Sequence, residues 1–111
     1  MNLLLTIKNS ENKLGVTTFI KEKTTRLNKY FSNKINVSWK NFTESGLHFS
    51  EVKISGFAGP DIKTKVNSRN QYESISLAVN KLEIQIQKRQ ALQKSKFTNE
   101  LKDRIHTNQL D

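Results

Sequence analysis

Three short runs of alternating residues follow one another in the middle of the chain, and they restrict the possible folds more than any other feature. In "KINVSWKNF", "FSEVKISGF" and "IKTKVN" apolar or β-branched residues alternate with polar ones, at Ile35, Val37 and Trp39, at Val52 and Ile54, and at Ile62, Thr64 and Val66. A period of two predicts strands that bury one face of a sheet and leave the other to solvent or a partner. Turn residues separate the runs at Ser45-Gly46 and at Ala58-Gly59-Pro60-Asp61. We therefore expect three antiparallel neighbours in a meander.

Two segments with helical spacing flank this meander. The first follows Asn12, a suitable N-cap, and the second follows Asn70, where Glu73 three residues later suggests a capping box. Each has one apolar stripe that we expect to be buried. The stripes are Val16, Phe19, Ile20, Thr24, Leu27, Tyr30 and Phe31 in the first segment, and Tyr72, Ile75, Ala78, Val79, Leu82 and Ile86 in the second.

The second helix is expected to outrun the sheet that it covers. A helix of about 24 residues is roughly 36 Å long, whereas a strand of ordinary length spans only about 20 Å. The projecting part would carry cationic side chains, namely Lys88, Arg89, Lys94 and Lys96.

With a further strand at Leu3–Ile7, the element order is β-α-β-β-β-α. Because each strand has one apolar face, both helices should cover the same face of a four-stranded sheet. The sequence thus predicts a two-layer α+β fold like that of double-stranded-RNA-binding domains. Its hydrophobic content of 34% suits two layers. We assign residues 1–95 to one domain and residues 96–111 to a frayed or helical tail.

The balance of charge indicates the class of partner. The 111 residues include 19 basic and 10 acidic groups, a formal net charge of +9 that is spread along the chain. A small basic domain of this kind favours a polyanion, usually nucleic acid. The aromatic residues Tyr30, Phe31 and Tyr72 are in the helical phase of the core, which argues against base stacking.

Other functional classes receive little support from the sequence. There is no cysteine, His48 and His106 are isolated, and no acidic and histidine set has metal-ligand spacing. We therefore expect no enzyme activity, no cofactor and no small-molecule substrate. The N-terminal "MNLLLTIK" lacks the features of a signal peptide, and no apolar run is long enough for a membrane helix. A cytoplasmic protein without a membrane partner is expected.

The stretch "NQYESISLAVNKLEIQIQKRQ" resembles the second helix of the ribosome hibernation-promoting factor and ribosome-associated inhibitor A family. The first helix, "FIKEKTTRLNKYF", and the strand "VKISG" are similar to the family's as well, and the resemblance covers about residues 1–95. The matching positions are Lys8, Lys23, Leu27, Lys29, Tyr30, Phe31, Tyr72, Ile75, Lys81, Leu82, Glu83, Gln85 and Lys88. The chain departs from the family pattern at Lys13, Thr17 and Ile84.

The resemblance implies a partner and a mode of action. A member of this family would bind the small ribosomal subunit and its rRNA at the decoding region, in the channel for messenger and transfer RNA. It would inhibit translation in stressed or stationary cells, and it would be monomeric away from the ribosome. The chain looks like a short form, without the C-terminal dimerisation domain of long members.

From charge, helical phase and the resemblance together, we expect a set of RNA-binding residues. The set is Lys8, Lys21, Lys23, Arg26, Lys29, Lys63, Lys65, Lys81, Gln85, Lys88 and Arg89. Two alternatives stay open at this point. One is a general double-stranded-RNA-binding domain, although the start of its last helix would lack the usual lysines. The other is a protein-interaction module that uses Leu77 and Ile84, seven residues apart, as a contact patch.

Overall fold

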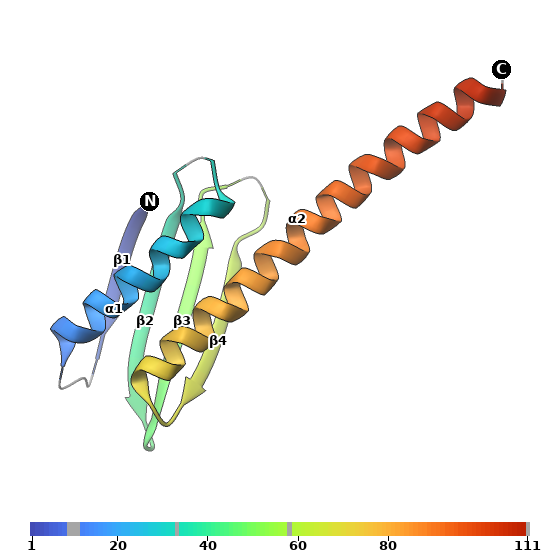
Figure 1. The fold of residues 1–111 in the computed structure, drawn as a ribbon. Helices are drawn as coiled ribbons and strands as arrows, with labels where there is room; N and C mark the ends of the chain where they lie inside the picture. The colour runs from blue at the N-terminus through green and yellow to red at the C-terminus, as the bar shows by residue number, and fades with distance from the viewer. Residues whose placement is uncertain (9–11, 33, 58, 111) are drawn as a thin grey trace.

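The computed structural model describes residues 1–8, 12–32, 34–57 and 59–110, with side chains as far as Leu92. In this part of the chain a four-stranded sheet is covered on one face by two helices, as expected for an α+β fold with two layers (Figure 1). The elements are β1 (Asn2–Ile7), α1 (Lys13–Thr25), the 3₁₀ helix η1 (Arg26–Tyr30), β2 (Asn36–Glu44), β3 (Leu47–Ser55), β4 (Ile62–Ser68) and α2 (Gln71–Leu110).

The strands lie in the order β1-β2-β3-β4. Because α1 returns the chain to the starting edge, β1 pairs in parallel with β2, whereas the three later strands form the expected antiparallel meander. Ser45 and Gly46 both have positive φ, 53° and 77°, and Glu44 pairs with Leu47. This is the geometry of a two-residue type I′ turn, whose twist matches that of the strands. The turn fixes the register of β2 and β3.

The core lies between the sheet and the two helices. Trp39 of β2 is fully buried at its centre, and most of the predicted stripes surround it. The buried apolar residues are Val16, Ile20, Leu27, Ile35, Val37, Trp39, Val52, Ile54, Ile62, Ile75, Ala78, Val79, Leu82 and Ile86. Lysines 53, 63 and 65 point from the opposite face of the sheet, as the alternation predicts.

The assignment of Tyr72 to the core was wrong, because its side chain is 38% exposed. Tyr72 lies in the first turn of α2, where the helix has just reached the sheet, and its ring meets the edge of Phe19 on α1. Phe19 and Val66 are half-buried and pack on the margin of the core. Helical phase identified the correct side of the helix, but the buried apolar residues of α2 begin one turn after Tyr72, at Ile75.

The first helical stripe is divided between two kinds of helix. The α-helix ends at Thr25, and a 3₁₀ turn continues to Tyr30. The hydroxyl groups of Thr24 and Thr25 donate to the carbonyls of Ile20 and Lys21, at 2.6 and 2.7 Å. Such bonds from β-branched hydroxyl residues weaken an α-helix, and a 3₁₀ turn is a common ending.

The second helix begins where the sequence predicts. The Asn70 side-chain oxygen accepts from the backbone N–H of Glu73 at 3.1 Å, and the Ser68 hydroxyl accepts from the N–H of Asn70 at 3.2 Å. Ser68 thus takes the part that the capping box gives to the Glu73 carboxylate. The helix extends well past the sheet to Leu110, further than the expected 24 residues (Figure 1). The expectations for Ala58, for the side chains of Lys94 and Lys96, and for those of residues 97–111, lie outside the described residues.

A chain of buried hydrogen bonds joins two strands to the start of α2. The Asn41 amide donates to the Ser50 hydroxyl, which lies 2.8 Å from the Ser74 hydroxyl, and Ser74 donates to the carbonyl of Gln71. Because Ser74 uses its proton on Gln71, Ser50 must be the donor to Ser74. All three side chains are almost fully buried. The bond between Ser50 and Ser74 therefore helps to position the start of α2 over β3.

Replacing Ser50 with alanine should test this chain of bonds. The substitution leaves the buried Asn41 amide without its acceptor, so the free energy of unfolding should fall by about 1–3 kcal/mol. Urea denaturation measures the loss. Ser38→Ala, on the open face of β2, is the matched control and should change stability by less than about 0.5 kcal/mol. Equal effects of the two substitutions would contradict the account.

Candidate nucleic-acid interface

The contact between the two helices is organised around one carboxylate. Glu83 of α2 is 9% exposed, and its two oxygens face residues of the first helical segment. Arg26 Nη2 lies 2.5 Å from Oε1, and the Tyr30 hydroxyl donates to Oε2 at 2.8 Å. Lys29 Nζ is 3.8 Å from the same Oε2, at the limit of an ion pair. Glu83 therefore holds the basic end of η1 against α2.

Two amide side chains of α2 extend this contact. Gln87 donates to the Tyr30 hydroxyl at 3.2 Å, and Gln90 donates to the Tyr30 backbone carbonyl at 3.0 Å. Tyr30 thus accepts from Gln87 while it donates to Glu83, which orders its hydroxyl. We call this set, Arg26, Tyr30, Glu83, Gln87 and Gln90, the interhelical clasp.

The other end of the contact between the two helices is aromatic. The rings of Phe19 and Tyr72 meet edge to face at 5.0 Å, and the Asn12 amide donates to the Tyr72 hydroxyl at 3.2 Å. Lys23 places its amine 5.3 Å from the centre of the Phe19 ring. The ring therefore fixes the position of one of the expected RNA-binding lysines next to this contact.

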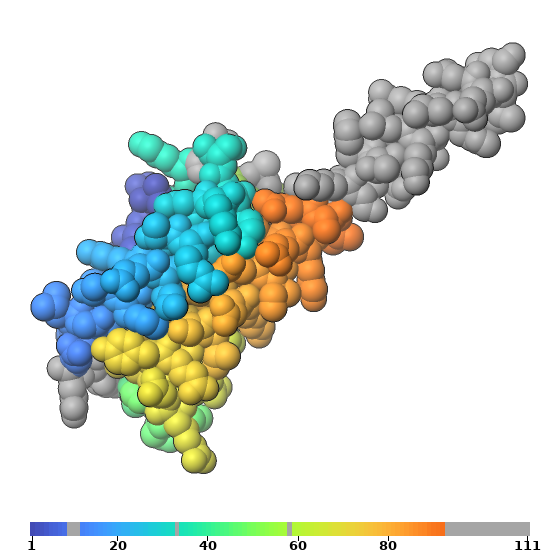
Figure 2. All heavy atoms as spheres, viewed as in Figure 1, coloured from blue at the N-terminus to red at the C-terminus, as the bar shows by residue number. Residues whose placement is uncertain are grey.

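The exposed stripe of α2 mixes cations and apolar residues. Leu77, Lys81, Ile84 and Lys88 recur at helical spacing, so they share one face. Leu77 and Ile84 are 41% and 51% exposed, and both lysines are exposed. Gln85 is half-buried beside this stripe. Figure 2 shows the layer that α1 and α2 form side by side. Over the described part of the chain, no carboxylate lies within ion-pair distance of Lys81 or Lys88.

Not every expected residue lies beside the contact between the two helices. Lys21 is separated from Lys23 by two residues, which is about 200° around a helix, so it points away from α2. Lys8 directly follows β1, and its backbone N–H donates to the carbonyl of Asn41. Arg89 donates from Nη1 to the carbonyl of Pro60 and lies over the ring of Phe57, at 5.5 Å. Arg89 therefore joins α2 to the loop after β3, and it is not a free projecting cation.

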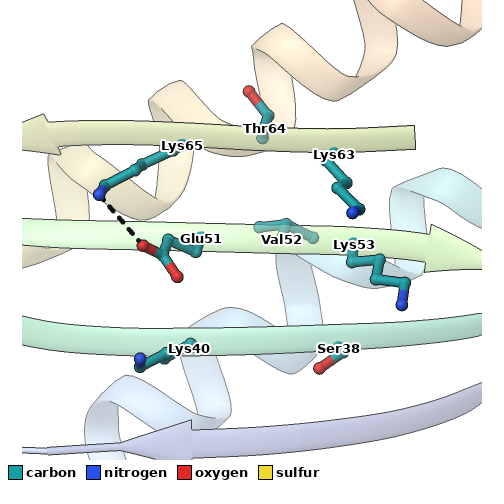
Figure 3. Close-up of a pocket in the computed structure, with 8 residues that line it drawn as sticks. All are labelled: Ser38, Lys40, Glu51, Val52, Lys53, Lys63, Thr64 and Lys65. Carbon is teal, nitrogen blue, oxygen red and sulfur yellow. Dashed lines mark ion pairs between the residues drawn. The ribbon is translucent and has the colours of Figure 1, made fainter. Parts of the chain in front are cut away.

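Lys63 and Lys65 lie on the opposite side of the domain, on the open face of the sheet (Figure 3). Two more lysines, Lys40 of β2 and Lys53 of β3, lie beside them around a shallow hollow. The expected set had omitted both. The alternation that placed Trp39 and Val52 in the core also places their neighbours Lys40 and Lys53 on this face, so the signal was present. The cationic side chains are thus divided between two opposite surfaces.

Two further features of the described residues bear on function. No group of three histidine, cysteine, aspartate or glutamate residues lies close enough to hold a metal ion. None of the described helices combines the length and the apolar character that crossing a bilayer requires.

A substitution in the interhelical clasp tests its role. Glu83→Gln removes the charge that compensates Arg26 in a nearly buried site, so the free energy of unfolding should fall by about 1–3 kcal/mol. Arg26→Ala should then cost less in the Glu83→Gln protein than in the parent, because the pair is already broken. Thermal or urea unfolding of the four proteins measures this coupling. The exposed Glu22→Gln serves as control, and purely additive losses would contradict the clasp.

The fold is similar to that of two solved structures. The N-terminal domain of Protein Y from Thermus thermophilus superposes with a TM-score of 0.72 at 20% sequence identity, covering 79% of this chain and 98% of that chain. A ribosomal subunit interface protein from Coxiella burnetii gives a TM-score of 0.66 at 19% identity, covering 82% and 99%. At this level of identity the likeness concerns the fold. No curated protein matches the sequence.

The sequence itself identifies the family. The family model described as "Sigma 54 modulation protein / S30EA ribosomal protein" matches residues 4–94, which include most of β1, all of β2 to β4 and the packed parts of both helices. This match confirms the resemblance found in the two helices and in "VKISG". The chain belongs to the Sigma 54 modulation protein / S30EA ribosomal protein family, the family of the ribosome hibernation-promoting factors.

Proposed function

We propose that this domain binds the small ribosomal subunit at the decoding region through contacts to rRNA, and that it inhibits translation in stressed or stationary cells. The match to a family of ribosomal proteins over residues 4–94 carries the proposal. The formal charge of +9 supports it, because rRNA is the main polyanion of the ribosome. Binding would take place in the cytoplasm, with the free protein monomeric.

The helix layer supplies the chemistry for the rRNA contact. Lys23, Lys81 and Lys88 present ammonium groups from a layer whose position is fixed by the interhelical clasp and the core. Each ammonium that neutralises a phosphate releases counterions, which favours binding. Arg26 and Lys29 share the charge of Glu83, so they contribute a weaker positive field. Lys8, Lys21 and Gln85 would add contacts at the margins.

Inhibition would follow from occupancy. A folded domain in the channel excludes messenger and transfer RNA by its volume, and this needs no reacting group. The rigid connection of both helices to the sheet matters here, because a flexible chain would lose more entropy on binding. A separate observation favours the folded ribosomal channel over a free RNA duplex as the partner. The first turn of α2 carries Glu73 and no lysine, whereas a duplex-binding domain usually has lysines at this place.

Charge reversal on the helix layer tests the proposal. In the triple variant Lys23→Glu, Lys81→Glu and Lys88→Glu, phosphate attraction becomes repulsion. Affinity for purified small subunits should fall at least roughly tenfold, equivalent to about 1.4 kcal/mol. Inhibition of cell-free translation should fall in parallel. Sedimentation with small subunits and a translation assay measure the two effects.

The control is a second triple variant with the same change of charge at exposed positions outside the expected set, Lys13→Glu, Lys34→Glu and Arg69→Glu. It should keep most of the binding and inhibition. Equal binding by parent and helix-layer variant would remove these lysines from the interface. A parent protein that neither sediments with small subunits nor inhibits translation would refute the proposal itself, and competition by free RNA duplex would favour a general duplex-binding domain.

A further inference from the structure

The open face of the sheet carries more cationic groups than its own carboxylates compensate. Lys40, Lys53, Lys63 and Lys65 surround a shallow hollow of about 550 Å³, and the nearby acidic residues are Glu51 and Asp61. Figure 3 shows Lys53 and Lys63 at one end of the hollow, and Lys40, Glu51 and Lys65 at the other. The helices and core lie on the far side of the sheet, so this surface is separate from the helix layer described above.

The two ends of the hollow differ in charge pattern. At one end the strand register sets Lys40 opposite Glu51 and Glu51 opposite Lys65, with Lys65 Nζ 3.3 Å from the carboxylate. At the other end Lys53 is directly opposite Lys63. Like charges directly opposite each other destabilise an antiparallel pair.

Only weak compensation is available for this second pair. Lys53 Nζ is 3.5 Å from Asp61, but both side chains are more than 40% exposed, and such an ion pair contributes little. For Lys63 no ion pair exists among the residues that the structure describes. An anion held between Lys53 and Lys63 would turn the unfavourable pair into a favourable one.

Aromatic rings order the lysines at the other end. Phe42 and Phe49 stack at 4.9 Å with an angle of 5° between their planes. Lys40 lies over the first ring and Lys65 over the second, at 5.4 and 5.5 Å. These contacts restrain two flexible side chains before any ligand arrives, which lowers the entropy cost of binding. The two cationic rows are two residues apart along each strand, or about 7 Å.

We propose that the open face binds a second segment of RNA, with its phosphates between Lys53 and Lys63 and along the row of Lys40 and Lys65. Charge complementarity selects this occupant, because regularly spaced cations match the repeated phosphates of a strand. The inference rests on the proposed function: if the helix layer binds rRNA, the domain bridges two rRNA segments. Two contacts made by one rigid body reinforce each other through their high effective concentration.

Tethered cleavage of RNA tests the proposal directly. The chain has no cysteine, so a single introduced cysteine can carry an iron–EDTA group that cleaves nearby RNA. Asn67→Cys places the probe on the open face, where Asn67 pairs with Phe49, and Asn80→Cys places it on the exposed side of α2. Bound to small subunits, the two proteins should cleave rRNA at two separate sets of positions.

A second measurement uses charge reversal of Lys53 and Lys63, the like-charged pair that is only weakly compensated. Lys53→Glu with Lys63→Glu should weaken binding to small subunits at least roughly tenfold, whereas the charge-matched Lys13→Glu with Lys34→Glu should stay within about threefold of the parent. Lys53→Gln with Lys63→Gln gives an intermediate loss without new acidic groups. Circular dichroism verifies folding of each variant.

The results distinguish the possible failures. Cleavage by the Asn80→Cys probe but not by the Asn67→Cys probe would overturn the proposal and leave the proposed function intact. Loss of binding by the Lys53 and Lys63 variants without cleavage from Asn67→Cys would place a ribosomal protein on the open face, which also overturns it. A parent protein that does not bind small subunits at all refutes the proposed function instead.

Discussion

The sheet has one apolar face, and this constraint determines the arrangement of the rest. Both helices cover that face, because the buried side chains of β2, β3 and β4 lie on it. Apart from Glu83, which is held between the helices, the charged side chains of these layers lie on the outside of the helix layer and on the open face of the sheet. A two-layer domain with cations on both sides is suited to a narrow space walled by phosphates, because either surface can meet an RNA segment without rearrangement of the core.

Buried polar groups give this simple layering a defined geometry. The bonds from Asn41 through Ser50 to Ser74 fix the start of α2 over the sheet, and Glu83 fixes its middle against the first helical segment. Each group would be costly to bury without its partner, so an alternative packing of the helices would lose these bonds. The backbone positions from which the helix layer presents its lysines are therefore well defined.

Local patterns predicted most of the fold, and long-range contacts account for what they missed. The alternating runs and the Ser45-Gly46 turn predicted the strands, and the alternation is enough to place Lys40 and Lys53 on the same face as Lys63. Helical phase could not reveal that Tyr72 lies beyond the packed layer, or that Arg89 meets the loop at Pro60, since both depend on distant segments. For the same reason the sequence did not distinguish Arg26, which pairs with Glu83, from Lys88, which has no ion pair among the residues that the structure describes.

The salt dependence of binding to the small ribosomal subunit tests the central claim most directly. If lysines on a rigid scaffold bind rRNA phosphates, the logarithm of the association constant should fall linearly with the logarithm of salt concentration. Each neutralised phosphate contributes a slope of about −0.7 to −0.9, so four or more contacts predict a slope of roughly −3 or steeper. An affinity that stays constant between about 50 and 200 mM salt would contradict the account.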